Sequence, residues 1–131
     1  MEARLLQSVF PTDTNPRGNL FGGTLVSWMD TAAGVAAMRR ARQVVVTAKI
    51  EDIEFKVPIL QGELVEVIAR VVSVGRTSMR VRVDVSKEDP LTGESEACTT
   101  GHFTLVAIGA DRTPVPVDPV DPRTSPGGVP G

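Results

Sequence analysis

One carboxylate in the sequence stands in a markedly apolar stretch. Asp30 directly follows Trp28 and Met29, and alanines dominate the residues that come after it. Taking an ionised side chain out of water is costly unless the charge is paired or takes part in a reaction. Two interpretations of Asp30 stay open at this point: a structural carboxylate bonded to a neighbouring basic group or turn, or a base or nucleophile in a dry cleft.

Two adjacent glycines precede this carboxylate. Gly22 and Gly23 stand where a helix is expected to begin, so their backbone N–H groups would have no partner within that helix. Such groups can hold an oxyanion or polarise a carbonyl, which activates an electrophile. The same glycines could instead serve only to give the chain a tight entry into the helix.

Helix geometry keeps these groups apart within one chain. At about 1.5 Å rise per residue, Gly22 and Asp30 lie roughly 12 Å apart along the axis, whereas a carbonyl held by one and attacked by the other needs about 5 to 7 Å. If the groups cooperate, the glycines of one chain must face the aspartate of another. The spacing therefore predicts a two-fold dimer with two equivalent sites at its interface.

Several other chemistries lack the residues that they need. The sequence has no G-x-S-x-G elbow, no G-x-x-x-x-G-K-[ST] phosphate loop and no G-x-G-x-x-G after a strand. A single cysteine, Cys98, and a single histidine, His102, exclude an internal disulfide and a standard zinc site, so we expect no metal. The formal charge of −2 offers no basic surface for nucleic acid or membrane. No secretory leader or membrane span is visible, which predicts a cytoplasmic chain.

The elements that must hold these residues can be predicted in outline. Residues 3–10 predict a short strand, and the proline-free, alanine-rich stretch 22–42 predicts a long helix. Because apolar residues almost encircle this helix, we expect it to be buried on most sides. Alternating or β-branched runs predict four further strands, at 44–55, 63–74, 77–86 and 96–108.

The predicted elements fit one domain. With no second helix between them, the strands should form a largely antiparallel sheet whose apolar face covers the helix. The fold class is therefore α+β, with one helix and five strands in the order β-α-β-β-β-β. We assign residues 1–112 to this domain. Residues 113–131 are rich in proline and glycine and show no packing pattern, so they predict an extended, solvated tail.

Three separated motifs, in order along the chain, carry a resemblance to a known family. They are DTNPRGNLFGGTLVSWMD, VVVTAKIEDIEFKVPILQGE and VGRTSM. Together they resemble the acyl-CoA thioesterases of the hotdog fold, in the branch of bacterial acyl-CoA hydrolases and animal cytosolic acyl-CoA hydrolases. The resemblance covers about residues 5–118. It implies a long central helix wrapped by an antiparallel five-stranded sheet, a homodimer as the catalytic unit, and a trimer of dimers.

The resemblance also implies catalytic roles for four residues. Asp30 matches the catalytic carboxylate of the family, and Asn15 matches an asparagine that positions the water or the thioester in the partner half-site. Gly22 and Gly23 match the helix-start pair whose backbone amide polarises the thioester carbonyl. Phe21 stands where many relatives have a histidine, so a histidine contact is missing at that point.

Two further segments are implied to bind substrate. GRTS resembles the coenzyme A contact of the family, with the arginine as a phosphate partner and the hydroxyls as hydrogen-bond donors. By itself this motif would indicate only an ordinary hairpin turn. EFKVPI matches a strand end near the pantetheine channel. The residues concerned are Gly75, Arg76, Thr77, Ser78, Phe55, Lys56 and Pro58.

The reaction implied is hydrolysis of an acyl-CoA thioester, with coenzyme A as part of the substrate and product and no separate cofactor. One alternative is a non-catalytic acyl-CoA binding or sensing protein, which would not need Asp30 and Asn15 together. A hotdog hydratase would need an aspartate and a histidine acting together, and His102 lies in the wrong motif for this. A purely structural subunit would leave Asp30 unexplained.

Overall fold

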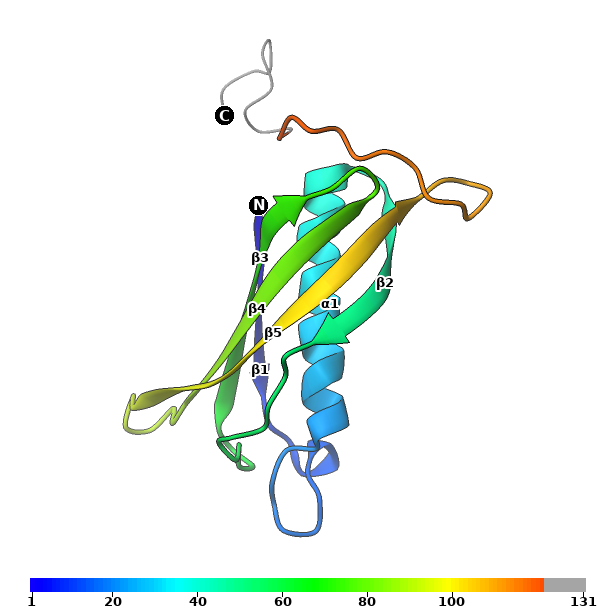
Figure 1. The fold of residues 1–131 in the computed structure, drawn as a ribbon. Helices are drawn as coiled ribbons and strands as arrows, with labels where there is room; N and C mark the ends of the chain where they lie inside the picture. The colour runs from blue at the N-terminus through cyan, green and yellow to red at the C-terminus, as the bar shows by residue number, and fades with distance from the viewer. Residues whose placement is uncertain (122–131) are drawn as a thin grey trace.

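Within residues 1–121, which the computed structural model describes, five strands and one long helix follow one another in the predicted order (Figure 1). A short 3-10 helix, η1, precedes the long helix. The bounds are β1 Glu2–Ser8, η1 Pro11–Asp13, α1 Gly22–Ala41, β2 Val44–Glu51, β3 Leu64–Val74, β4 Ser78–Glu88 and β5 Ser95–Ile108.

The five strands form one antiparallel sheet that lies across α1 (Figure 1). Their order is β1-β3-β4-β5-β2, so the first two strands of the chain end up at opposite edges. β3, β4 and β5 are joined in sequence, and the long link from β2 to β3 crosses the sheet. This topology leaves one side of β1 and one side of β2 without a partner strand among the described residues.

The core lies between the sheet and one face of α1. β4 alternates as the sequence predicts, with Met79, Val81, Val83 and Val85 at most 2% exposed. The helix meets these residues mainly with small side chains, because its buried apolar residues are five alanines and two larger residues. Small side chains let the helix axis approach the strands closely. The helix residues are Leu25, Met29, Ala32, Ala33, Ala36, Ala37 and Ala41.

Fifteen of the 20 residues of α1 are buried or half-buried, as expected for a helix that is covered on most sides. One face remains open, and Ser27, Thr31 and Met38 are exposed on it. This face is open to solvent or to another chain. No helical segment within residues 1–121 has the length and hydropathy of a membrane span.

β2 ends earlier than predicted, and the chain then runs close to the core. Asp52 has a positive φ of 66°, which stops the strand at Glu51. Ile53 packs against Gly101 of β5, where an added Cβ would lie 2.6 Å from Ile53 Cγ1 and 3.1 Å from Met29 Cε. Only glycine permits this approach. The contact fixes residues 52–58 next to α1.

The predicted solvated tail is wrong in its first residues. Residues 113–117 fold back over the end of the sheet, and Val117 is only 4% exposed. The prediction missed this because the valines that anchor the segment are scattered among prolines and form no periodic pattern. The domain boundary at residue 112 stays a prediction. The last part of the tail, residues 122–131, lies outside the described residues.

Candidate active site

A pocket of about 350 Å³ opens at the N-terminal end of α1. Four of the residues that line it are predicted site residues, and they come from three separate segments of the chain. Its walls also include apolar side chains from the helix and from the segment after β2. The four predicted residues are Asn15, Gly22, Phe55 and Pro58.

The start of α1 supplies unpaired backbone donors to this end of the pocket. The first helical hydrogen bond runs from the Leu25 N–H to the Phe21 carbonyl at 3.1 Å, and no side chain caps the helix at Phe21. The N–H groups of Gly22 and Gly23 therefore make no hydrogen bond with any described residue. Such free donors, at the positive end of the helix dipole, suit a developing oxyanion.

The structure separates the two glycines that the sequence could not tell apart. Gly22 lines the pocket, and a Cβ added there would lie 3.2 Å from Cζ of Phe55. A Cβ added at Gly23 would meet nothing within 4 Å, and Gly23 does not line the pocket. Gly22 is therefore the position where the phenyl ring and the helix start come closest.

Asn15 is held by its own loop in a way that leaves one group free. Its Oδ1 accepts hydrogen bonds from the backbone N–H groups of Arg17 at 2.9 Å and Asn19 at 3.2 Å. Its backbone N–H also donates to the Asn19 carbonyl at 2.8 Å. The Nδ2 group donates to none of the described residues. Because the oxygen end fixes the amide, the nitrogen end is available at the pocket.

Asp30 lies outside this pocket, on α1 about two turns beyond Gly22. It is half-buried, and its Oδ1 accepts a hydrogen bond of 2.5 Å from the Thr47 hydroxyl on β2. It forms no ion pair with any described basic residue. The possibility that a basic group holds Asp30 is therefore wrong. The partner is a neutral hydroxyl, which orients the carboxylate without neutralising it.

Sequence reasoning missed Thr47 entirely. The residue lies within the apolar run at the start of β2, and only its pairing with Asp30 across 17 residues gives it a role. Its single signal in the sequence is a hydroxyl among valines. That signal is weak, because threonine is a common strand residue.

The predicted coenzyme A contact lies far from the pocket within one chain. Gly75, Arg76 and Thr77 connect β3 to β4 with Ser78 as the first residue of β4, and this turn lies beside the C-terminal end of α1 (Figure 1). Since α1 has 20 residues, its two ends are about 30 Å apart. One chain alone therefore does not join this turn to the groups around Gly22.

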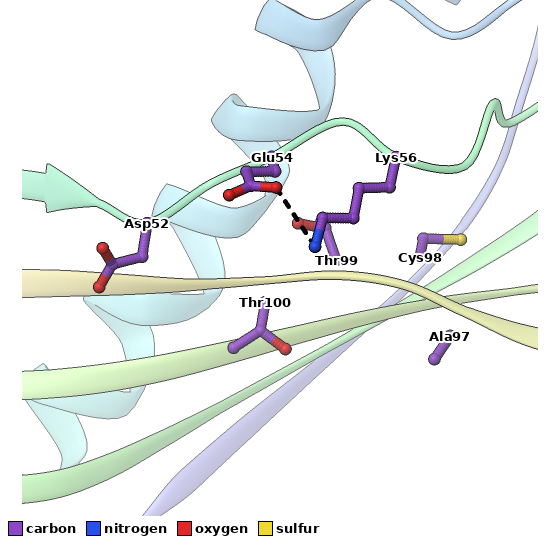
Figure 2. A pocket seen from close by; sticks show the side chains of 7 residues that line it. All are labelled: Asp52, Glu54, Lys56, Ala97, Cys98, Thr99 and Thr100. Carbon is purple, nitrogen blue, oxygen red and sulfur yellow. Dashed lines mark ion pairs between the residues drawn. The ribbon is translucent and has the colours of Figure 1, made fainter.

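Lys56 is also separated from the residues with which it was grouped. The extended segment after β2 sends Phe55 and Pro58 to the pocket at the start of α1, whereas Lys56 lines a second pocket of about 380 Å³ (Figure 2). There Lys56 Nζ pairs with Glu54 at 3.2 Å. The second pocket lies between this segment and β5, and its walls are Asp52, Glu54, Lys56, Ala97, Cys98, Thr99 and Thr100.

The groups around the second pocket do not form a nucleophilic site. Burial raises the pKa of the Cys98 thiol, which keeps it protonated and weakly reactive. His102 Nδ1 lies 3.4 Å from Asp52 Oδ2, so the histidine faces this aspartate rather than Asp30. Neither His102 nor Asp52 lines the pocket around Gly22. No cluster of three potential metal ligands occurs within residues 1–121.

A family model confirms the relationship that the motifs indicate. The model of the thioesterase superfamily matches residues 17–94, which is more than half of the chain. The chain belongs to the thioesterase superfamily. Its helix and five-stranded antiparallel sheet form the hotdog fold predicted from the sequence.

Individual members of the thioesterase superfamily are similar over most of this chain. It is 43% identical over 116 residues to an uncharacterised acyl-CoA thioester hydrolase of Bacillus subtilis, across 88% of this chain and 67% of that protein. The structure of a hexameric acyl-CoA thioesterase matches with a TM-score of 0.87 at 37% identity, over 94% of this chain and 79% of the other.

A third relative was solved with ligands. The acyl-CoA hydrolase of Staphylococcus aureus, in complex with butyryl coenzyme A and coenzyme A, matches with a TM-score of 0.85 at 32% identity. The match covers 91% of this chain and 73% of the other. That enzyme has also been solved with an asparagine, an aspartate or a threonine replaced by alanine.

We predict that Cys98 in this member of the thioesterase superfamily reacts slowly with thiol reagents. Because burial disfavours the thiolate, alkylation by iodoacetamide at pH 8 should be at least about tenfold slower for the folded chain than for the urea-unfolded chain. The raised pKa also affects stability, because the thiol proton dissociates from the unfolded chain at a lower pH than from the folded chain. The thiol therefore contributes less to the free energy of unfolding as the pH rises above the ordinary cysteine pKa. Cys98→Ala is the blank for labelling. Equal rates for folded and unfolded chains would contradict the prediction.

Proposed function

We propose that this chain is an acyl-CoA thioester hydrolase whose active site is shared between two copies of the chain. The observation that carries this proposal is the division of the candidate groups. The donors Asn15 and Gly22 share one pocket, and the only candidate base, Asp30, lies outside it on the same rigid helix. The named activities of the Bacillus subtilis and Staphylococcus aureus relatives support the reaction assigned.

Each group has one role in the proposed reaction. The thioester carbonyl accepts a hydrogen bond from the Gly22 N–H, which stabilises the oxyanion as it forms. Asp30 of the second copy either takes a proton from the attacking water or attacks the carbonyl carbon itself. Asn15 orients the water or the thioester through Nδ2. The C–S bond then breaks, and coenzyme A leaves as a thiolate with little need for a general acid. If Asp30 has attacked the carbonyl carbon itself, water then cleaves the resulting anhydride, which releases the free acid and restores the carboxylate.

The edge of the sheet offers a surface for the second copy. Within residues 1–121, β2 pairs only with β5, and its Val44, Val46 and Ile50 are 63%, 45% and 42% exposed. Apolar side chains along an unpaired strand favour pairing with another strand. A two-fold contact there would place Thr47 and Asp30 next to the partner chain. We propose this homodimer as the catalytic unit and, from the hexameric relative, a trimer of dimers. A cytoplasmic location stays a prediction.

Thr47 enters the proposal as a positioning residue. The asparagine, aspartate and threonine replaced in the Staphylococcus aureus structures follow one another at the same intervals as Asn15, Asp30 and Thr47 do here. This agreement supports treating the three residues as one functional group. The hydroxyl of Thr47 would fix one carboxylate oxygen of Asp30, leaving the other to act on water.

The first prediction from this proposal concerns the base. Asp30→Asn should lower kcat/KM for acyl-CoA hydrolysis by at least about a hundredfold, because the amide can neither accept the proton nor attack. The assay is thiol release from acyl-CoAs of increasing chain length, with circular dichroism to check folding. A folded wild-type chain that binds acyl-CoA but releases no thiol would instead be a binding or sensing protein, and Asp30 would be structural.

A second prediction concerns the hydroxyl that holds the base. Thr47→Val should lower kcat by roughly tenfold or more with little change in KM, since it removes one hydrogen bond to a charged group. Thr47→Ser keeps the hydroxyl and is the matched control, with activity close to that of the wild type. Equal activity of the valine and serine variants would show that the hydrogen bond plays no part in catalysis.

A third prediction tests the sharing of the site. Asn15→Asp keeps the oxygen that holds the loop but removes the Nδ2 donor, and Asp30→Asn removes the base. Each variant alone should be nearly inactive. After unfolding and refolding together in equal amounts, they should recover about a quarter of the wild-type rate per chain, because half of the dimers contain one intact site of two.

The control for this mixing experiment is each variant refolded with wild-type chain. If every site came from one chain, the mixture of the two variants would stay inactive. Such a result would contradict the shared site while leaving the hydrolase activity itself in place.

A further inference from the structure

The chain after β5 makes a tight turn and comes back across the end of the fold. The Gly109 N–H donates to the Thr113 carbonyl at 3.0 Å, and the Arg112 N–H donates to the Gly109 carbonyl at 3.0 Å. The Asp111 carboxylate accepts from the Thr113 hydroxyl at 2.7 Å and from the Thr113 N–H at 3.2 Å, and these two bonds lower the pKa of Asp111. Figure 1 shows the following residues running back above the C-terminal end of α1 and the β3–β4 turn.

Residues 113–117, the return segment, are anchored at several points. The Val115 N–H donates to the Ala107 carbonyl at 2.9 Å, and the Val117 N–H donates to the Arg76 carbonyl at 2.8 Å. The Gln43 side chain donates to the Pro116 carbonyl at 3.2 Å. Val117 is buried, and Val115 packs against the core. The return segment is therefore packed and hydrogen-bonded against the end of the fold.

One of these anchors lies on the turn that connects β3 to β4. The Ser78 carbonyl accepts from the Gly75 N–H at 2.7 Å, and the Thr77 carbonyl accepts from the Ala107 N–H at 2.9 Å. The Arg76 carbonyl, between them, accepts only from Val117 among the described residues. The return segment thus fixes the peptide at the tip of the turn.

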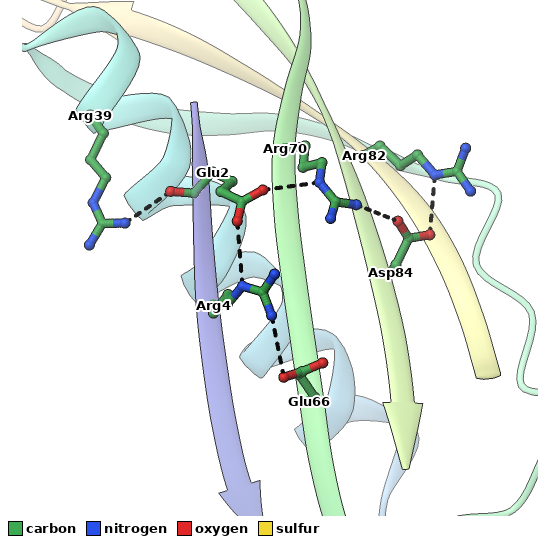
Figure 3. A network of polar contacts seen from close by, with 7 residues as sticks. All are labelled: Glu2, Arg4, Arg39, Glu66, Arg70, Arg82 and Asp84. Carbon is green, nitrogen blue, oxygen red and sulfur yellow. Dashed lines mark hydrogen bonds and ion pairs between the residues drawn. The ribbon is translucent and has the colours of Figure 1, made fainter. Parts of the chain in front are cut away.

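The side chain of Arg76 differs from its neighbours on β3 and β4. Arg70 pairs with Glu2 and Asp84, and Arg82 pairs with Asp84, in the network of Figure 3. Arg76 is exposed and forms no ion pair with any described residue. A guanidinium without a carboxylate partner, on a fixed backbone, is suited to binding a phosphate group.

We propose that the return segment is a positioning element for Arg76, through which the C-terminal part of the chain sets the affinity for the phosphates of coenzyme A. The proposal rests on the proposed function, because it assigns the anion to the substrate. The Val117 N–H holds the turn in its binding conformation before the ligand arrives. Ordering the turn in advance removes an entropic cost from binding.

The repeated tail sequence offers a matched pair of variants. Val117 and Val120 each stand between a proline and an aspartate, in the run PVDPVDP. The Val117 N–H donates to the Arg76 carbonyl, whereas the Val120 N–H donates to the nearby Asp118 carboxylate. Val117→Pro removes the first donor and Val120→Pro the second, with the same chemical change.

The test measures the binding of coenzyme A by calorimetry and the hydrolysis of one acyl-CoA. Val117→Pro should weaken coenzyme A binding about tenfold and raise KM by a similar factor with kcat nearly unchanged, whereas Val120→Pro should match the wild type.

Arg76→Ala should weaken coenzyme A binding to a similar degree. The double variant, Val117→Pro with Arg76→Ala, should bind coenzyme A almost as well as Arg76→Ala alone, because Val117→Pro acts through the side chain that Arg76→Ala removes. Val117→Ala keeps the N–H and reports the effect of side-chain packing if the proline variant does not fold.

The outcomes separate this inference from the proposed function. Unchanged coenzyme A binding in Val117→Pro, or a loss that simply adds to that of Arg76→Ala, would overturn the positioning role while wild-type hydrolysis continued. If Val117→Pro does not fold, full-strength coenzyme A binding by Arg76→Ala would also overturn it, because the turn would then hold no side chain that binds the phosphates. A wild-type chain that neither binds coenzyme A nor hydrolyses acyl-CoA would overturn both proposals.

Discussion

The fixed rise of an α-helix determines how this protein can build a site. The helix start at Gly22 and the carboxylate of Asp30 belong to one rigid helix, and no side-chain movement removes their separation along it. The other candidate site residues are divided in the same way between the helix start and the carboxylate. The loop of Asn15 and the ring of Phe55 gather at the helix start, whereas β2 presents Thr47 to the carboxylate. In the proposed function, this separation is the reason why the site is shared between two copies.

Close packing of the helix on the sheet keeps both halves in place. The alanines of α1 and the absence of a side chain at Gly101 let Met29 and Ile53 meet over β5. This contact holds the segment after β2 against the helix, with alternate residues pointing into different pockets. A larger side chain at any of these positions would push the segment outward and move Phe55 away from Gly22.

The sequence predicts the architecture well because its patterns are periodic. The alternation in β4 and the long proline-free helix gave the element order and the core residues correctly. The prediction also grouped Asn15 with Gly22, since the motif that contains them is local. The prediction failed for residues whose position depends on contacts with residues that are distant in the sequence. Thr47 is hydrogen-bonded to Asp30, which lies 17 residues earlier in the chain. Val117 is buried because the chain turns back after β5, and the valines among the prolines form no periodic pattern that would predict this. Lys56 was misgrouped because an extended backbone points neighbouring residues in opposite directions.

The two edges of the sheet differ in character. On β1, Glu2 and Arg4 form ion pairs with each other and with residues of β3, so charged side chains line that edge (Figure 3). The β2 edge carries exposed Val44 and Val46 instead. A sheet with unpaired, apolar strands at both edges would keep pairing with further chains and grow into a fibril. In the proposed dimer, the charged side chains on β1 would stop further strand pairing once two β2 edges have met, so the assembly would close at a finite size.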